Sequence, residues 1–408
     1  MSPLLPHRLS IVAFLVAMVA GLSSGDLPAQ VVLPPGFGMP AGQTVPSQGF
    51  DLALAALAAG DFKSGLEIAV LEHKGGIRAV ALRWIDSIAS AALVGECHFE
   101  LGNLREAVAA YDEAMLISAN HADWLLAVQF PPQGPVPLAQ PRAATWGRSQ
   151  RNASPAAIPG TMSIRMGGAD ANEVLQKGGV LTAPVNYPIR PHEIVRSLVI
   201  ALYRRGVILG ELAREGAAIG EASKALLRRP APPNHYSQSW IDIALGTALW
   251  SQGKIDQAQP LLTRGLIIGN QFDHPLTCWG LIVLGRIALA GDQPAAAARY
   301  FEEATYTAAD YGDARALEEA FRLAAAAHLA AGTRGVPPSI SGGAEWSRSA
   351  LPVLRATLLG LEAESLAAAG DAQAATARLA EVDGRLLRAD PGRGLAGMQV
   401  AYAAALGA

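Results

Sequence analysis

Apolar and polar positions alternate with helical spacing over most of the chain. This pattern predicts two helical segments, over residues 50–128 and 192–406, whose helices are separated by short glycine-containing turns. Between them, residues 129–191 are dense in Pro and Gly and predict an irregular insert. Residues 26–49 have a similar composition and predict a tether, and a shorter break over Gly332–Gly343 predicts a loop. The pattern as a whole predicts an all-α fold with one long interruption.

Internal similarity is the most informative feature of the helical segments. In ALVGECHFELGNLREAVAAYDEAM, residues 92–115, a glycine in the first predicted helix is followed by a Gly-Asn turn, and the second helix carries Ala, an aromatic residue and Ala. Glycine and alanine allow two antiparallel helices to approach closely, and the aromatic ring fills the gap beside them. Two further copies recur downstream. The residues at these positions in the three copies are Gly95, Ala107, Tyr111 and Ala114; Gly246 and Ala258; and Gly285, Ala297 and Phe301.

This arrangement resembles the tetratricopeptide (TPR) repeat. The chain departs from the family pattern because the proline that closes each unit is absent, the aromatic residue of the first helix is often lost, and the copies are not contiguous. The resemblance implies an α-solenoid of helical hairpins in which the first helix of each hairpin lines a concave face.

The insert over residues 129–191 is too long to be an ordinary connection between helices. Thr161–Met166 and Val180–Thr182 predict two short strands that could form a β-hairpin. The alternative is a Pro-rich surface loop with exposed backbone, which a protease would cut first, for example after Arg148 or Arg151.

Composition and charge favour packed helices and argue against nucleic-acid binding. The chain is 51% hydrophobic but only 6% aromatic, and much of its apolar content is alanine, the strongest helix former. The net charge is −3, and no segment carries the dense Lys/Arg stripe that neutralises phosphates. The pairs Arg204-Arg205 and Glu318-Glu319 are interpreted as solvated helix faces.

Residues 1–25 have the layout of a secretory signal peptide. A short basic region precedes an apolar run over residues 9–22, and small residues follow. The run is shorter than the roughly 20 residues that span a bilayer. We therefore expect cleavage, a mature chain that begins near Asp26 or Gln30, and export to the periplasm, the cell envelope or the cell exterior without a remaining membrane span. An uncleaved anchor is the alternative.

Sequence motifs of catalytic, cofactor and metal sites are absent. The chain contains no phosphate-binding glycine loop, no GxSxG elbow and no HExxH pair, and its eight histidines are scattered. Cys97 and Cys278 are too far apart in a repeat array to be expected to meet, so both are predicted to be buried thiols. These observations predict a non-catalytic protein without a metal or cofactor. A hydrolase with a site near the insert is an alternative that a cleft of perturbed carboxylates would favour.

The TPR resemblance implies a partner-binding groove. Alignment on the repeat glycines places Trp240, Ile243, Thr247, Trp250, Trp279, Ile282, Arg286 and Leu289 on the concave face. Tryptophan and arginine dominate binding hot spots, so we expect an exported scaffold that binds a protein or peptide partner through this groove. The alternative for the tryptophans is packing between helices. The alternative function is an architectural cell-envelope component that assembles through its insert and tether.

Overall fold

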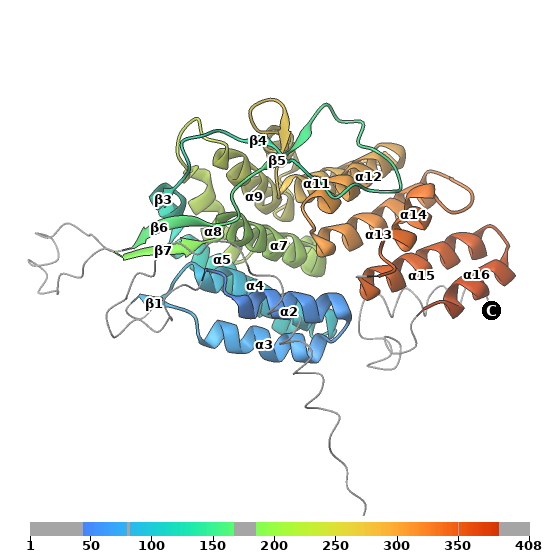
Figure 1. Ribbon diagram of the computed structural model, residues 1–408, viewed down its shortest axis with the longest axis horizontal. Helices are drawn as coiled ribbons and strands as arrows, with labels where there is room; N and C mark the ends of the chain where they lie inside the picture. The colour runs from blue at the N-terminus through green and yellow to red at the C-terminus, as the bar shows by residue number, and fades with distance from the viewer. Residues whose placement is uncertain (1–43, 80–81, 167–184, 350, 383–408) are drawn as a thin grey trace, which may run out of the picture. The chain divides into compact units, whose positions relative to one another are not determined.

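The protein is described here by a computed structural model, which covers residues 44–79, 82–166, 185–349 and 351–382. Most of these residues are helical, as the repeat pattern predicts, and they form successive antiparallel helices (Figure 1). The predicted signal peptide, most of the tether and the predicted strand Val180–Thr182 lie outside the described residues.

One series of helices, which we call the first helices, packs side by side. They are α2 (Gln48–Ala59), α4 (Asp86–Glu100), α7 (Pro191–Leu209), α9 (Ser237–Ser251), α11 (Thr277–Ala290), α13 (Ala314–Ala330) and α15 (Pro352–Ala368). Each of them contacts the next one in the series, and α15 also contacts α2. The first helices thus bring residues from both ends of the described chain together.

The second helices complete the hairpins. They are α3 (Phe62–Lys74), α5 (Leu104–Asn120), α8 (Ala217–Leu227), α10 (Ile255–Gly265), α12 (Pro294–Asp310), α14 (Pro338–Trp346) and α16 (Ala372–Ala380), with 3₁₀ turns η1 (Ala122–Ala127) and η2 (Gly210–Arg214) between some of them. Helix α8 packs on α5 and α9, and α14 packs on α15. Helix α14 begins inside the stretch for which the sequence predicts a loop, so that prediction is wrong for its second half.

Gly-Asp turns join several of these helices. Gly60 ends α2 in the left-handed conformation, with φ of 83°, and the side chain of Asp61 accepts a hydrogen bond from the first turn of α3. Gly370 and Asp371 repeat this arrangement between α15 and α16. Each turn ends one helix and caps the next, because glycine tolerates positive φ and aspartate caps well.

The repeat glycines lie where two helices nearly touch. A Cβ atom added to Gly95 would lie 2.4 Å from the ring of Tyr111, and one added to Gly285 would lie 2.4 Å from the ring of Phe301. Gly246 takes the same place against Leu262, and Ala107, Ala114, Ala258 and Ala297 are fully buried. The pairs of α4 with α5 and of α11 with α12 therefore have no room for a larger residue at these glycines.

We expect Gly95→Ala to lower the free energy of unfolding by about 1–3 kcal/mol, because the new methyl group would overlap the Tyr111 ring. The matched control is Gly220→Ala, in the middle of α8, where an added Cβ meets nothing within 4 Å. That change should leave stability unchanged or raise it by about 0.5–1 kcal/mol. Urea denaturation followed by circular dichroism measures both, and equal shifts would contradict the packing assigned to Gly95.

The insert contains short strands. They are β3 (Val128–Gln129), β4 (Val136–Pro137), β5 (Ser154–Ala157), β6 (Met162–Met166) and β7 (Val185–Ile189), and elsewhere β1 (Arg78–Ala79) pairs with β2 (Leu82–Arg83). Strand β6 lies between β3 and β7 in an antiparallel sheet. Strand β5 pairs with β4 and, in parallel, with β8 (Phe272–Asp273) from the turn before α11. The first predicted strand is thus observed as β6, and its partner is β7.

The part of the insert between β4 and β6 is bound to the helices beneath it, above α11 and α12 in Figure 1. The Trp146 indole is buried, and its Nε1 donates a hydrogen bond to Thr305 Oγ1 at 2.9 Å. The Arg151 guanidinium lies 2.7 Å from the buried carboxylate of Asp273. These contacts hold part of the insert against the helices: Arg151, one of the positions offered for cleavage, is in an ion pair, whereas Arg148, the other, is exposed.

His274, directly after β8, is a fully buried neutral histidine. Its Nε2 lies 2.6 Å from the carbonyl oxygen of Gly265, and its Nδ1 lies 3.3 Å from the backbone nitrogen of Leu276. A carbonyl only accepts and an amide only donates, so the proton is on Nε2. Burial lowers the pKa of His274 to about 4.

This histidine should make the protein sensitive to acid. Its folded-state pKa lies below its ordinary value of 6.5, so the unfolded chain binds an extra proton and stability is lost as the pH falls from about 6.5 to 4. Asp273 is also buried, and burial raises its pKa to about 6, so this carboxyl group adds stability as the pH falls through the same range. The contribution of His274 is therefore isolated by comparing the wild type with a variant that lacks this histidine. We expect the stability difference between wild type and His274→Gln to shrink by roughly 2 kcal/mol between pH 7 and pH 4.5. Urea titrations at both pH values measure it; a constant difference would contradict the buried neutral ring.

Candidate functional site

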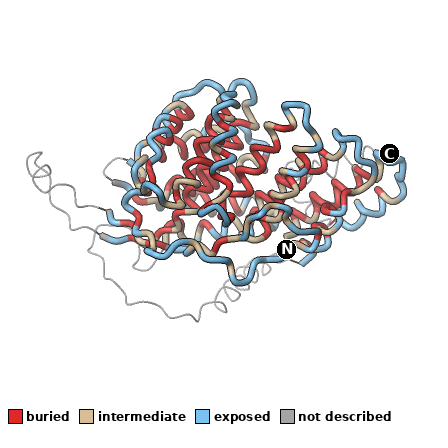
Figure 2. Tube along the Cα trace, turned by 90° about the horizontal axis from the view of Figure 1, so that it is seen from above, coloured by how far each residue is buried: buried red, intermediate tan, exposed pale blue. Residues whose placement is uncertain are grey.

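Charged side chains of the first helices meet in the protein interior, where buried residues follow the facing sides of the helices (Figure 2). Arg204 of α7 donates hydrogen bonds to Glu319 of α13 at 2.8 Å and to Glu96 of α4 at 3.3 Å. Arg286 of α11 donates to Glu319 at 3.0 Å and to the Tyr203 hydroxyl at 2.6 Å. We call these five side chains the inner charge network; it connects α4, α7, α11 and α13.

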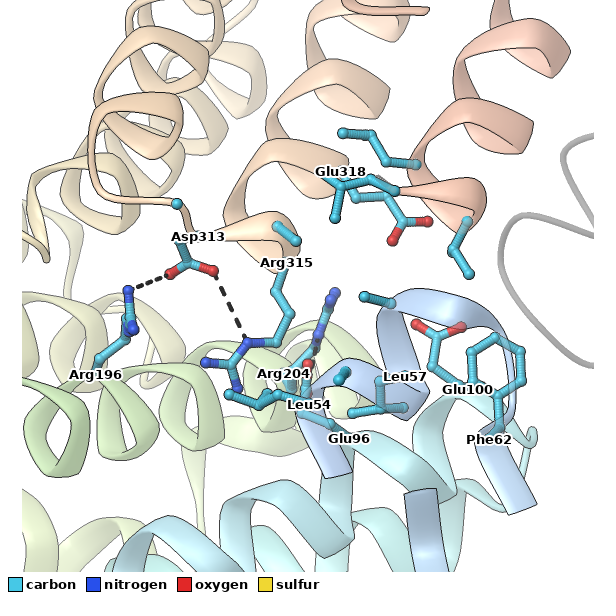
Figure 3. A pocket seen from close by; sticks show the side chains of 17 residues that line it. Leu54, Leu57, Phe62, Glu96, Glu100, Arg196, Arg204, Asp313, Arg315 and Glu318 are labelled. Atoms are coloured by element: carbon cyan, nitrogen blue, oxygen red, sulfur yellow. Dashed lines mark hydrogen bonds and ion pairs between the residues drawn. The ribbon is translucent and has the colours of Figure 1, made fainter. Parts of the chain in front are cut away.

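A pocket of about 250 Å³ lies next to the inner charge network (Figure 3). One part of its wall is apolar and includes Leu54, Leu57, Phe62 and Leu354, from α2, the start of α3 and α15. The other part is charged and includes Glu96, Glu100, Arg196, Arg204, Asp313, Arg315 and Glu318. Figure 3 shows Arg196, Asp313 and Arg315 at one side of the pocket and Phe62 and Glu100 at the other.

Asp313 organises the charged side of the pocket. It caps α13 by accepting a hydrogen bond from the amide of Ala316 at 3.2 Å, and it accepts another from Trp279 Nε1 at 3.0 Å. Its carboxylate also lies 3.3 Å from Arg196 Nη1. Arg315 approaches the same carboxylate only to 3.9 Å through Nε, and its buried Nη1 has no hydrogen-bond partner. One nitrogen of the Arg315 guanidinium is therefore buried without a hydrogen bond.

The chain shares one repeat with a known family. Residues 89–121, which include most of α4 and all of α5, match the family model described as tetratricopeptide repeat. This match and the helical hairpins around it make the fold TPR-like. Repeats of this kind typically form non-catalytic scaffolds for protein–protein interaction. No curated protein matches the chain. Within the described ranges, none of the helices has the length and apolar character needed to cross a membrane.

The TPR-like array buries charges that the sequence places on solvated faces. Arg204 and Arg205 are each only 4% exposed, and Glu319 is 6% exposed, so that interpretation is wrong for all three. Burial would raise the pKa of Glu319, but Arg204, Arg286 and the hydrogen bond from Tyr203 outweigh it and hold this pKa well below its ordinary value. Removing one partner would leave a buried charge uncompensated, which is strongly unfavourable.

The structure places most of the residues predicted to line a groove in the protein interior. Trp240 and Trp279 are fully buried, and Trp250 is half-buried and stacks on Tyr203 with ring centroids 5.6 Å apart. Ile243, Thr247 and Ile282 are buried as well, Leu289 is half-buried, and Arg286 belongs to the inner charge network. The first helices do face inward. Tyr203 of α7 contacts the rings of both Trp250 and Trp279 and is hydrogen-bonded to Glu319 of α13, so these two tryptophans face other helices.

Two carboxylates with raised pKa values lie near the insert, and one of them is fully buried against it. Burial raises the pKa of Asp273 to about 6, and burial together with Asp273 raises the pKa of Asp310 to about 6. Asp273 is 2% exposed and faces Arg151, so this carboxylate fixes the insert to the helices. Cys97 and Cys278 are free and buried, as predicted. Among the described residues, no three His, Cys, Asp or Glu side chains converge to hold a metal ion.

None of the pocket's charged side chains was predicted as a binding residue. The alignment did contain a signal, because the position after the repeat glycine is Glu96 in one copy and Arg286 in another. Opposite charges at the same inward position of two repeats indicate side chains that meet inside the array. The apolar side of the pocket has no such signal, because Leu54 and Leu57 look like ordinary helix residues in the sequence.

Proposed function

We propose that this TPR-like protein is a non-catalytic scaffold that binds a protein partner, and that the pocket receives one apolar side chain of that partner. The observation that carries the proposal is the apolar wall formed by Leu54, Leu57 and Phe62 on an inner surface that is otherwise filled by charged and aromatic side chains. A volume of about 250 Å³ is smaller than the roughly 300–1,000 Å³ of sites for drug-sized ligands, so it suits a single anchor residue. Anchors of this kind carry much of the affinity of an interface.

The test fills the pocket and leaves the rest of the surface unchanged. Ala58 lines the pocket from α2, whereas its neighbour Ala59 is exposed and does not line it. We therefore compare Ala58→Phe with the matched control Ala59→Phe, after checking that both variants melt near the wild-type temperature. Random dodecapeptides displayed on phage are selected against the wild-type full-length protein, and the recovered peptides are synthesised.

We expect recovered peptides to share an apolar residue. Loss of a true anchor costs 2 kcal/mol or more, so these peptides should bind Ala58→Phe about 30-fold more weakly or worse than the wild type. Their affinity for Ala59→Phe should be unchanged. Equal binding to the wild type and to Ala58→Phe would overturn the pocket as the binding site, and so would the absence of any enriched peptide.

We also propose that the protein is exported. The support is the signal-like sequence of residues 1–25, with its apolar run and the small residues that follow. N-terminal sequencing of the protein purified from its native cells should find a chain that begins near Asp26 or Gln30. An intact Met1 in a cytosolic fraction would contradict export.

A further inference from the structure

We propose that the surface of α12, α13 and α14 beneath the insert is a second partner-binding surface, which fits an extended segment carrying a tryptophan and, five residues later, an arginine. The chain's own residues 141–151, which we call the strap, occupy this surface and compete with such a partner. The proposal goes beyond the proposed function, because the side chains that hold the strap are different from those that line the pocket.

The strap is attached as a bound peptide is, through one buried ring. Of residues 138–150, all of which the structure describes, Trp146 alone is buried. Its Nε1 donates a hydrogen bond to Thr305 Oγ1 of α12. Its ring meets Phe321 of α13 and Trp346 of α14 edge to face, with centroids 5.2 Å and 5.3 Å apart. An aromatic ring held in a slot between neighbouring elements is the usual anchor of an interface.

Helix α14 leaves the space that this anchor occupies. A Cβ atom added to Gly342 would lie 2.6 Å from Trp146 Cβ and 2.9 Å from Trp146 Cα, and the three nearest heavy atoms all belong to Trp146. The guanidinium carbon of Arg142 lies 3.8 Å from the centre of the Trp346 ring, which is a favourable cation–π distance. A larger residue at Gly342 therefore acts first on the strap and not on the helices.

Polar contacts fix the direction of the strap. The Ser149 hydroxyl and the Gln150 amide both donate to the Glu303 carboxylate, at 2.5 Å and 2.7 Å. The Arg151 guanidinium lies 2.7 Å from the carboxylate of Asp273. The strap contains three arginines and no acid, so its charge is complementary to that of this surface. A partner segment with the same spacing of tryptophan and arginine would meet the same groups.

The strap can leave this surface while the helices stay folded. Segments with few buried contacts open locally at a lower free energy than the whole protein, and the strap has one buried residue. Its flanks keep it at an effective concentration on the order of mM. The apparent affinity of a partner is reduced by the fraction of molecules in which the strap is closed. The strap therefore sets a threshold that only a tighter segment passes.

A fluorescein-labelled peptide with the sequence of residues 139–153 tests the proposal by anisotropy on the full-length protein. Trp146→Ala removes the anchor and empties its slot, so this variant should bind the peptide about 10-fold more tightly than the wild type, or more. The same peptide with alanine in place of its tryptophan should bind about 30-fold more weakly. Arg148→Gln is the matched control, because Arg148 is an exposed strap residue, and it should bind like the wild type.

Two further variants check the place of binding and the fold. Gly342→Leu, added to Trp146→Ala, should abolish the tighter binding, because leucine fills the slot. Thermal melting shows whether each variant is folded. If Trp146→Ala melts well below the wild type, Ser149→Ala replaces it. That change removes only the hydroxyl contact with Glu303 and should strengthen peptide binding by a smaller factor.

The proposal is overturned if the peptide binds the wild type and the opened variants equally, if it binds none of them, or if Gly342→Leu leaves binding unchanged. Sedimentation at increasing concentration tests the other occupant. A dimer that forms in the wild type and is lost in Trp146→Ala would show that a second copy takes the surface, and not a partner. Ala58→Phe should not alter binding of this peptide, so the pocket and the strap surface stand or fail separately.

Discussion

Arg204→Met should lower the free energy of unfolding by about 3–5 kcal/mol, one of the largest effects we expect for any single substitution. The reason is that Glu96 and Glu319 stay buried after their shared cation is removed. Methionine has a similar length and no charge, so the change removes the ion pairs with little change in volume. Chemical denaturation at neutral pH measures the effect.

The control for this prediction is Arg228→Met, because Arg228 is 58% exposed and lies 3.8 Å from Asp123. Exposed ion pairs contribute little, so we expect a change of less than about 1 kcal/mol. Neutralising both acids should then rescue part of the Arg204→Met loss, since no unpaired charge remains. Similar losses for Arg204→Met and Arg228→Met would show that the network is hydrated and not buried.

Trp279→Ala should cost about 3–5 kcal/mol of stability, as expected for a large aromatic residue removed from a core. The ring is fully buried, lies 5.4 Å from the ring of Tyr203, and donates a hydrogen bond to Asp313. Trp124→Ala is the control, because Trp124 is half-buried beside an open hollow and should cost clearly less. Thermal melting compares the two. A Trp279→Ala variant that melts like the wild type would restore the interpretation of Trp279 as a groove residue.

The hairpins were predictable because their determinants are local. The glycine, alanine and aromatic positions of residues 92–115 set the approach of two adjacent helices, and Gly-Asp turns set where the helices end. Helix α14 was missed because its sequence contains two glycines and little helical propensity. Packing forms it: Ile340 is fully buried, and Gly343 lies against the ring of Phe321. Tertiary contacts of this kind override local preference.

The candidate site was not predictable in the same way. Arg204 and Glu319 are 115 residues apart in the sequence, and each sits on a helix whose pattern is compatible with a solvated face. Periodicity identifies a polar face but does not tell whether that face meets water or another helix. The same limit applies to Trp279, because the alignment shows that it faces inward without showing how much space remains there.

The contact between α15 and α2 has a consequence for how the protein opens and how its repeats can vary. Phe62 at the start of α3 packs with Val353 of α15 and with Val382 just after α16, so the first and last described hairpins share one hydrophobic cluster. In a linear repeat array, end units fray independently and repeats are readily gained or lost. Here the first and last described hairpins share packing, so opening of one should loosen the other, and amide protons in α3 and α16 should exchange with solvent together. Duplicating an internal hairpin would move α15 away from α2 and separate the two walls of the pocket. The contact between α15 and α2 therefore constrains the number of repeats, in addition to the stability that each repeat contributes.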